Sequence, residues 1–360
     1  MLLRFLAPLL LIACLGGASP AASPVPPDWN EAMRAQTLTA AEKALTKYTF
    51  ANEVPALRAS IEAHRSTYLA IQDPQAFSEA VTADLYAVTH DKHVRLNYSA
   101  NSMPMNNDKP TAADMAHFAQ LEKFGNFGYN AAMRLQGNVG YLRLGGAPGI
   151  PGFWAMPDSK AAIDSAMGLL AHTDALIIDI RHNGGGDPDS LDYLMGYFFE
   201  KPTELTSIVM VQGGKTQILK QFSAGKVAAT RYLGKPLYVL TDDRTFSCAE
   251  QFAYDMKTLH RATLVGHTTG GGANPGAFFG LNDHFAVFVP LGRAENPYTK
   301  TNWEGVGVAP NIAIAPEKAL LDAYTRALGA ERDSFDLAVA ERNRALKDPA
   351  TALAASVPQL

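Results

Sequence analysis

The stretch ALIIDIRHNGGG, residues 175–186, decides the fold class of this chain. Its first six residues are almost all apolar, which is typical of a strand that is covered on both faces in a parallel sheet. Three glycines follow shortly afterwards and allow backbone with positive φ, so that another chain or a ligand can approach closely. The N–H groups of such a turn can form an anion-binding concavity. The pattern matches neither G-x-G-x-x-G nor a Walker motif, which disfavours nucleotide binding. An ordinary glycine-rich turn remains the alternative.

Strands and helices alternate on both sides of this stretch. We expect helices at 159–170, 190–199 and 249–259, and strands at 139–144, 175–180, 236–240, 263–266, 286–290 and 306–314. Apolar strands that alternate with helices predict an α/β core whose sheet is covered by helices.

The segments outside this core have a different character. Residues 31–100 show helical periodicity and predict an N-terminal helical lobe, preceded by a proline-rich linker at 23–30. Residues 101–137 are expected to connect the lobe to a core at 138–316, and residues 317–360 to form a C-terminal helical segment.

Composition limits the class of protein. The chain has 360 residues, 47% of them hydrophobic and 18% charged, which fits two domains with a well-formed core. The 29 Gly and 22 Pro residues imply many tight turns and favour a mixed α/β protein. A net charge of -4 offers no basic stripe for a nucleic acid. Two cysteines, Cys14 and Cys248, exclude a disulfide scaffold and a Cys-rich zinc domain, and we expect no disulfide between them.

Residues 1–22 are typical of a secretory signal peptide. One positive charge at Arg4 precedes an apolar run at 5–15, which is too short to span a bilayer. We therefore expect an exported protein, either periplasmic, at the outer envelope or secreted, with no transmembrane span. The sequence LIAC, residues 11–14, resembles a bacterial lipobox, in which Cys14 becomes the lipidated first residue. The alternative is that Cys14 is only an apolar residue of the run and that cleavage falls later.

A serine lies between an expected strand and an expected helix, in the sequence TFSCAE at 245–250. There its hydroxyl would lie beside the unpaired N–H groups of the first helical turn, which could stabilise an oxyanion, with the Cys248 N–H as the first candidate donor. However, Ser247-x-x-Glu250 is also a plain capping box, which needs no chemistry. The G-x-S-x-G elbow of α/β-hydrolases is absent, which argues against a nucleophile of that kind.

His90 and His93 flank Asp91 and Lys92 at the end of the helical lobe. A His-x-x-His pair is a weak indication of a metal site, and no HExxH motif or Cys cluster supports one. We therefore expect neither a metal nor another cofactor.

The motifs carry more information together than singly. Five of them follow one another: GYLRL at 140–144, DIRHNGGG at 179–186, TFSCAE at 245–250, GHTTGGGA at 266–273 and WEGVGVAP at 303–310. In this order they resemble the tail-specific (C-terminal processing) serine peptidase family. The resemblance is greater to the branch that includes interphotoreceptor retinoid-binding protein and the tricorn core peptidase. It implies a ClpP/crotonase-like core of repeated ββα units.

The resemblance also implies roles for particular residues. Ser247 falls on the nucleophile of the family. Gly185, with Gly184 beside it, falls on the turn that gives one oxyanion donor, and Cys248 would give the other. Many members use a Ser-Lys dyad, but here Gly271 stands at the lysine position.

The branch of interphotoreceptor retinoid-binding protein and tricorn instead looks like a Ser-His-Glu system, so the resemblance implies that arrangement here. His93 would be the base, since DKH at 91–93 resembles the Asp-Gly-His motif of the branch, and Glu304 would be the acid that orients it. An ordinary histidine pKa of about 6.5 suits a base at neutral pH. Lys92 departs from the small residue usual at that position.

The sequence thus predicts an exported serine peptidase that acts on peptides or unfolded proteins through a Ser247 acyl-enzyme. Two alternatives remain: a non-catalytic protein of the same fold that binds hydrophobic ligands, and an esterase that uses the same residues. The interval between His93 and residue 138 is about half of what a PDZ domain needs. The usual device for binding a substrate's C-terminus is therefore not expected.

Overall fold

The structure is a computed structural model that describes residues 25, 26, 28–100, 112–145, 159–212, 215–330 and 336–356. The predicted signal peptide, including Cys14, lies outside the described residues. The chain divides into two compact units. Unit 1 comprises residues 1–121, 208–219 and 274–295, and unit 2 comprises residues 122–207, 220–273 and 296–360. No helix of the described residues is long and apolar enough to cross a membrane.

Unit 2 is built on a six-stranded sheet in the order β12-β8-β7-β4-β3-β2. The five strands from β12 to β3 are parallel, and β2 pairs antiparallel with β3. The strands are β2 (Tyr129–Leu135), β3 (Val139–Leu144), β4 (Ala175–Asp179), β7 (Leu237–Thr241), β8 (Thr263–Gly266) and β12 (Ile312–Ala313). All five residues of β4 are buried, as the apolar run predicts for a strand covered on both faces.

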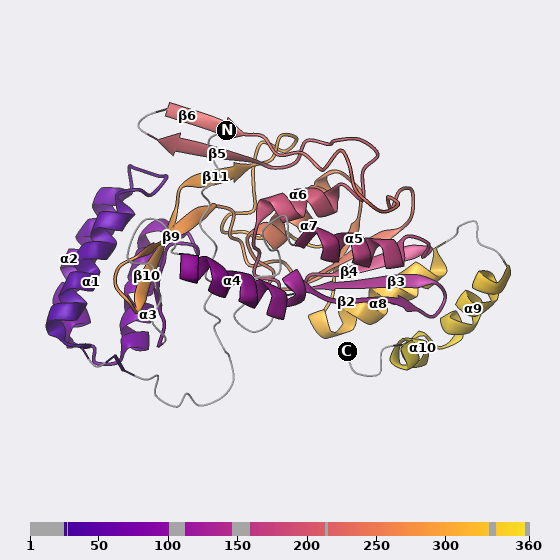
Figure 1. Ribbon diagram of the computed structural model, residues 1–360, viewed down its shortest axis with the longest axis horizontal. Coiled ribbons are helices and arrows are strands. Elements are labelled where there is room, and N and C mark those ends of the chain that lie inside the picture. The colour runs from indigo at the N-terminus through magenta and orange to yellow at the C-terminus, as the bar shows by residue number, and fades with distance from the viewer. Residues whose placement is uncertain are drawn as a thin grey trace. The chain divides into compact units, whose positions relative to one another are not determined.

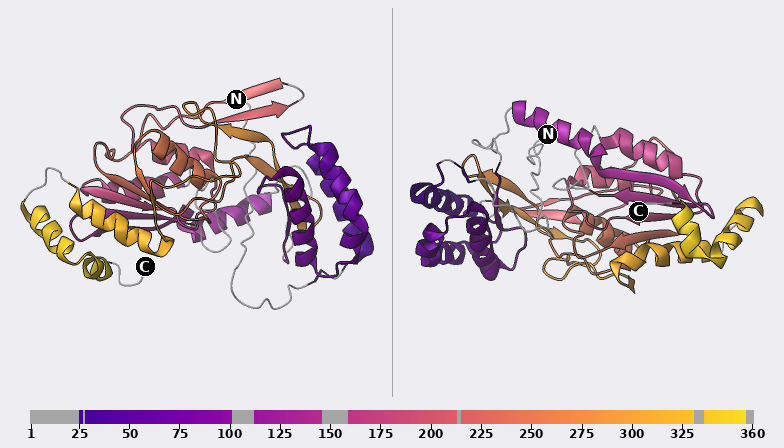
Figure 2. Two further views of the ribbon diagram at one scale, coloured as in Figure 1. Left: turned by 180° about the vertical axis from the view of Figure 1, so that it is seen from behind. Right: turned by 90° about the horizontal axis from the view of Figure 1, so that it is seen from below.

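Helices cover both faces of this sheet (Figure 1). Those on one face are α5 (Ser159–Leu170), α6 (Pro188–Met195) and α7 (Cys248–Thr258), and on the other face lies α8 (Pro316–Gly329). Tyr324 and four alanines or leucines of α8 pack against apolar residues of the strands, including Tyr141 and Ile177. Two further helices, α9 (Asp336–Lys347) and α10 (Pro349–Ser356), follow α8, and Figure 2 shows all three in yellow on the same side of the unit.

Within the described residues, unit 1 contains a group of helices, most of α4 (Ala112–Phe124) and two small sheets. The group consists of α1 (Glu31–Leu45), α2 (Val54–Ala70) and α3 (Pro74–Thr89). The sheets have the orders β1-β10-β9 and β11-β5-β6. Their strands are β1 (Arg95–Tyr98), β5 (Ser207–Gln212), β6 (Lys215–Leu219), β9 (Gly276–Gly280), β10 (Phe285–Pro290) and β11 (Gly292–Glu295).

The core of unit 1 is aromatic. Phe285 of β10 stacks on Trp29 with ring centroids 4.9 Å apart and meets Phe77 of α3 edge-on at 5.6 Å. Such pairs add packing energy beyond the burial of apolar area. This core joins the helices to β1 and β10, and so supports the short segment between α3 and β1 that carries His93.

The predicted fold class is confirmed: the chain has an α/β core with a helical N-terminal region. Most expected elements form, but two are wrong in extent. Helix α6 ends at Met195 instead of residue 199, and within 306–314 only Ile312–Ala313 is a strand. The closing segment is helical and consists of the separate helices α8, α9 and α10. Residues 101–137, expected as a connection, carry α4 (Ala112–Phe124) and the edge strand β2.

Candidate active site

Three loops of unit 2 lie side by side at the carboxyl ends of the strands of its sheet. The glycine turn 184–186 follows β4, the Ser247 turn follows β7, and residues 267–272 follow β8. Because β4, β7 and β8 are neighbouring parallel strands, their carboxyl ends lie side by side. Ligands of open α/β sheets bind outside the carboxyl ends of the strands.

Ser247 lies in a strained turn between β7 and α7. Its φ of 54° and ψ of -122° are costly for a residue with a Cβ, and such strain gathers at functional sites. A nucleophile on a sharp strand-to-helix turn is the device of the G-x-S-x-G elbow. The glycines of that motif are absent from this chain. Other contacts impose the turn here.

One of these contacts is with Gly185. A Cβ at this position would lie 2.8 Å from the Cys248 nitrogen and 2.8 Å from the Ser247 Cβ, so only glycine fits. The Phe246 N–H donates to the Asn183 carbonyl at 2.9 Å and joins the two turns. The Gly185 N–H donates to the Asn183 side chain at 2.9 Å. The structure therefore brings Ser247, Cys248 and the glycine turn together.

Cys248 presents a backbone donor and an inert thiol. It is the first residue of α7, so its N–H has no acceptor within the helix and points with the positive end of the helix dipole. Its side chain is a buried free thiol, and burial raises the pKa of that thiol well above its ordinary value. A thiol that stays protonated is a poor nucleophile.

Glu250 forms the predicted capping box and also binds a distant glycine turn. Its carboxylate accepts the Ser247 N–H at 2.9 Å, as a capping box requires. The same carboxylate is fully buried and accepts the N–H groups of Gly271 and Gly272 at 2.6 and 2.8 Å. Burial raises its pKa to about 7 despite these donors.

Glu304 lies in a loop that encloses Gly271. The Glu304 carboxylate accepts the Ala273 N–H at 2.5 Å, and the indole N–H of the buried Trp303 donates to the Gly272 carbonyl at 2.8 Å. The Gly305 N–H donates to the Gly271 carbonyl at 3.0 Å. A Cβ on Gly271 would lie 3.1–3.2 Å from backbone atoms of residues 305–307. The loop that carries Glu304 thus crowds the position of any Cβ at residue 271.

We expect Gly271→Ala to lower the free energy of unfolding by about 2–4 kcal/mol, from strain at positive φ and from crowding against the Glu304 loop. Gly271 has a φ of +81°, and the control Gly234 has a φ of +66° with nothing within 4 Å of its added Cβ. Gly234→Ala should therefore cost only the strain, about 1–2 kcal/mol. Urea unfolding measures both. Equal losses in the two variants would show that the loop does not restrict position 271.

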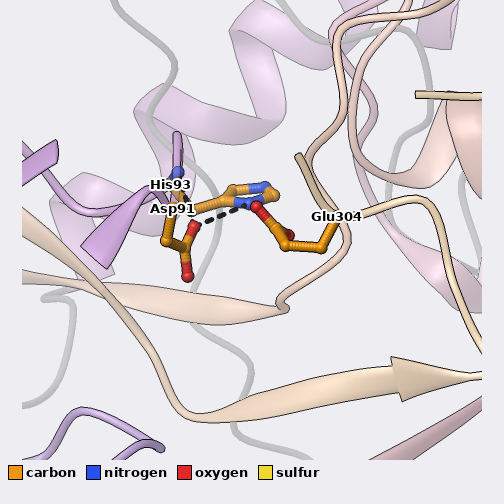
Figure 3. A group of neighbouring side chains, drawn as sticks. All are labelled: Asp91, His93 and Glu304. Atoms are coloured by element: carbon orange, nitrogen blue, oxygen red, sulfur yellow. Dashed lines mark hydrogen bonds and ion pairs between the residues drawn. The ribbon is translucent and has the colours of Figure 1, made fainter. Parts of the chain in front are cut away.

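The predicted base, His93, belongs to unit 1. It follows α3 and precedes β1, and its side chain is buried, with the ring stacked on Phe288 of β10 at 5.3 Å. Asp91 lies beside it, with 3.8 Å between the Asp91 Oδ1 and the His93 Nδ1 (Figure 3). Asp91 Oδ1 also accepts the His93 backbone N–H at 2.9 Å, which fixes the turn.

The electrostatics of His93 differ from the sequence expectation. Burial and, second, the nearby Arg95 guanidinium lower its pKa to about 3. The departure at Lys92 is not among these causes. At neutral pH the imidazole is therefore uncharged and can accept a proton, while the imidazolium would need carboxylates for its stabilisation.

Sequence reasoning missed two carboxylates. Asp91 is held by the Asn274 amide at 2.9 Å and the Tyr48 hydroxyl at 3.3 Å, both within unit 1. The position of Asp91, two residues before His93, is the sequence feature that could have indicated a carboxylate beside the histidine. Glu250 was assigned to capping alone, because the glycine turn that it binds lies 21 residues further along the chain.

Comparison with known proteins places this geometry in context. Residues 138–314 match the family described as "Peptidase family S41". Among solved structures, a lipoprotein from Streptococcus agalactiae has 15% identity and a TM-score of 0.51, with coverage of 85% of this chain and 98% of that one. A photosystem II D1 C-terminal processing protease has 15% identity and a TM-score of 0.45, with coverage of 79% and 94%. A peptidase from Parabacteroides merdae has 17% identity and a TM-score of 0.48, with coverage of 78% and 90%. The lipoprotein shares the fold of this chain, and the family match supplies the identity: residues 138–314 belong to peptidase family S41, a family of serine-type peptidases.

Proposed function

We propose that this protein is an exported peptidase that hydrolyses peptide bonds through a Ser247 acyl-enzyme, with His93 as the general base and Glu304 as the carboxylate that orients it. The observation that carries the proposal is the contact of Gly185 with Ser247 and Cys248. It puts a strained serine, a helix N-terminus and a glycine turn in one place, as acyl transfer requires.

The oxyanion would be bound by two backbone N–H groups. Cys248 supplies one. Because the Gly185 N–H already donates to Asn183, the Gly184 N–H is the better second donor, and Gly185 keeps the two turns in contact. Removing one such donor typically costs about 10²–10³ in kcat.

The chain itself supports joining His93 and Glu304 in one triad. Within unit 2, the Ala273 N–H binds Glu304, and within unit 1, the Asn274 side chain binds Asp91, the neighbour of His93. A single peptide bond links Ala273 to Asn274. The residues that hold the two parts of the proposed triad are thus consecutive in the sequence.

The steps follow from these roles. His93 takes the proton of Ser247 while the serine oxygen attacks the substrate carbonyl, and the N–H groups of the oxyanion hole bind the negative oxygen. His93 then gives the proton to the leaving amine. Water hydrolyses the acyl-enzyme with His93 again as the base. Glu304 fixes the imidazole tautomer and stabilises the imidazolium, which the low pKa of His93 makes necessary.

Profiling with a peptide library tests the reaction. The wild-type protein should cleave peptides of the library, and Ser247→Ala should cleave none of them. Cleavage of small acyl esters without any peptide cleavage would replace the peptidase with an esterase. Binding of hydrophobic ligands with neither activity would establish the non-catalytic alternative.

Export rests on residues 1–22, and we propose a lipid anchor at Cys14. In bacterial expression the protein should lose its first thirteen residues and take up an alkyne-labelled fatty acid, because lipoprotein cleavage leaves the modified cysteine first. Cys14→Ser should abolish this labelling. Full-length protein in the cytoplasm would contradict export, and an unlabelled protein cleaved after Cys14 would contradict only the anchor.

A further inference from the structure

We propose that Glu250 is a positioning residue, whose ionised carboxylate holds Ser247 and the turn 269–272 in their catalytic arrangement. The inference rests on the proposed function of Ser247 and adds a residue that the triad does not use. All of the contacts that support it lie within unit 2.

The Glu250 carboxylate has four donors. Oε2 accepts the N–H groups of Ser247 at 2.9 Å and Gly272 at 2.8 Å. Oε1 accepts the Gly271 N–H at 2.6 Å and the Thr269 hydroxyl at 2.5 Å. A carboxylate can accept about four hydrogen bonds, so this one has no capacity left for a proton in the reaction. It therefore acts through the groups that it holds.

These bonds connect the nucleophile to the loop of the proposed acid. The Thr269 hydroxyl accepts the Val308 N–H at 2.7 Å, and the Gly271 carbonyl accepts the Gly305 N–H at 3.0 Å. Residues 305–308 directly follow Glu304. One buried carboxylate thus links the Ser247 turn to both ends of the segment that follows Glu304.

The charge of Glu250 is necessary for this link. A protonated carboxyl has a hydroxyl where an acceptor was, so the four hydrogen bonds that hold the Ser247 turn and the 269–272 turn would be weakened and rearranged. The strained φ and ψ of Ser247 persist only while the surrounding contacts impose them. Protonation should therefore let the serine relax, and lower kcat without removing the substrate-binding surface.

The protonated form of Glu250 is accessible near neutral pH, since burial raises the pKa of Glu250 to about 7. The groups that face its carboxylate are the four donors already named, from α7 and the 269–272 turn, and none of them is charged. His93, with a pKa of about 3, titrates far below this range. Burial also raises the pKa values of Asp192 and Asp255, to about 8 and about 7, but neither binds the Ser247 turn. We therefore expect protonation of Glu250 to give an acid limb of activity near neutral pH.

Asp255 provides a matched control. It lies on the same helix, is fully buried, and has a pKa that burial raises to about 7. Its carboxylate binds Thr206 and Asn296, and not the Ser247 turn. Glu250→Gln and Asp255→Asn both replace a buried carboxylate with an amide of the same shape, and only the first touches the nucleophile turn.

The experiment compares kcat and KM from about pH 5 to 9 for the wild type and both variants, on a peptide that the wild type cleaves. We expect Glu250→Gln to lower kcat at pH 8 about tenfold or more with KM within about threefold, and to lose the acid limb. Asp255→Asn should keep the wild-type profile. A wild-type acid limb in Glu250→Gln, or its equal loss in Asp255→Asn, would overturn the proposal.

Backbone hydrogen exchange separates this proposal from the peptidase assignment, because it needs no activity. The amides of Ser247, Gly271 and Gly272 should exchange faster in Glu250→Gln, and not in Asp255→Asn. If no peptide is cleaved but this difference is found, the proposed reaction fails and the positioning by Glu250 stands. If exchange is unchanged, Glu250 does not hold the turns.

Discussion

Ser247→Ala is expected to lower kcat by about 10⁵- to 10⁶-fold, because loss of the nucleophile in a triad costs about as much as loss of the whole triad. The residual rate would come from the oxyanion hole, which the variant keeps. The fold should be preserved, since the strained backbone of Ser247 is imposed by Gly185 and Glu250 and not by the hydroxyl.

The control is Ser165→Ala, which removes an exposed serine hydroxyl on α5 that bonds only to the Ala161 carbonyl. It should retain the wild-type rate. Steady-state hydrolysis of a library-derived peptide measures both variants. If Ser247→Ala kept more than about one hundredth of the wild-type kcat, another group would have to be the nucleophile.

His93→Ala is expected to lower kcat by about 10⁴- to 10⁶-fold, since the serine hydroxyl then has no base. His64→Ala, at a half-exposed histidine of the same unit, is the control and should leave the rate unchanged. Similar losses in both variants would indicate disruption of unit 1 and would count against His93 as the base.

The pKa of His93 gives a second measurement on the same variant. Unfolding raises this pKa from about 3 to its ordinary value of 6.5, so below pH 6.5 the unfolded chain binds a proton that the folded protein does not. The stability of the wild type should therefore fall as the pH falls, by about 2 kcal/mol from this group alone at pH 5. His93→Ala should lack this contribution. Parallel losses of stability in both proteins between pH 7 and 5 would contradict a buried neutral imidazole.

The elements that could be predicted from the sequence are the strands that are buried on both faces. β4 and β7 are mostly apolar because both faces of the central sheet are covered, and such runs are visible without a structure. β6 is mostly exposed and β1 has only four residues, so neither has a pattern that separates it from a loop. β1 moreover pairs with β10, a strand far along the chain, which local sequence does not encode.

The candidate site divides in the same way. Ser247, Cys248 and the glycine turn could be predicted because each lies directly after a recognisable strand. At position 271 the sequence shows only that a glycine stands where many relatives have a lysine. The physical reason is that a Cβ there would crowd the backbone of residues 305–307, and this depends on the tertiary structure. Glu250 satisfied a local motif completely, which concealed its long-range bonds to Gly271 and Gly272.

The central claim is that Ser247 is an activated nucleophile. Reaction of the purified protein with a fluorophosphonate, followed by digestion and mass spectrometry, tests it most directly. A single adduct on Ser247 in the wild type, absent in Ser247→Ala and greatly slowed in His93→Ala, is the predicted result. No adduct on the wild type, or an adduct on a different serine that persists in Ser247→Ala, would contradict it.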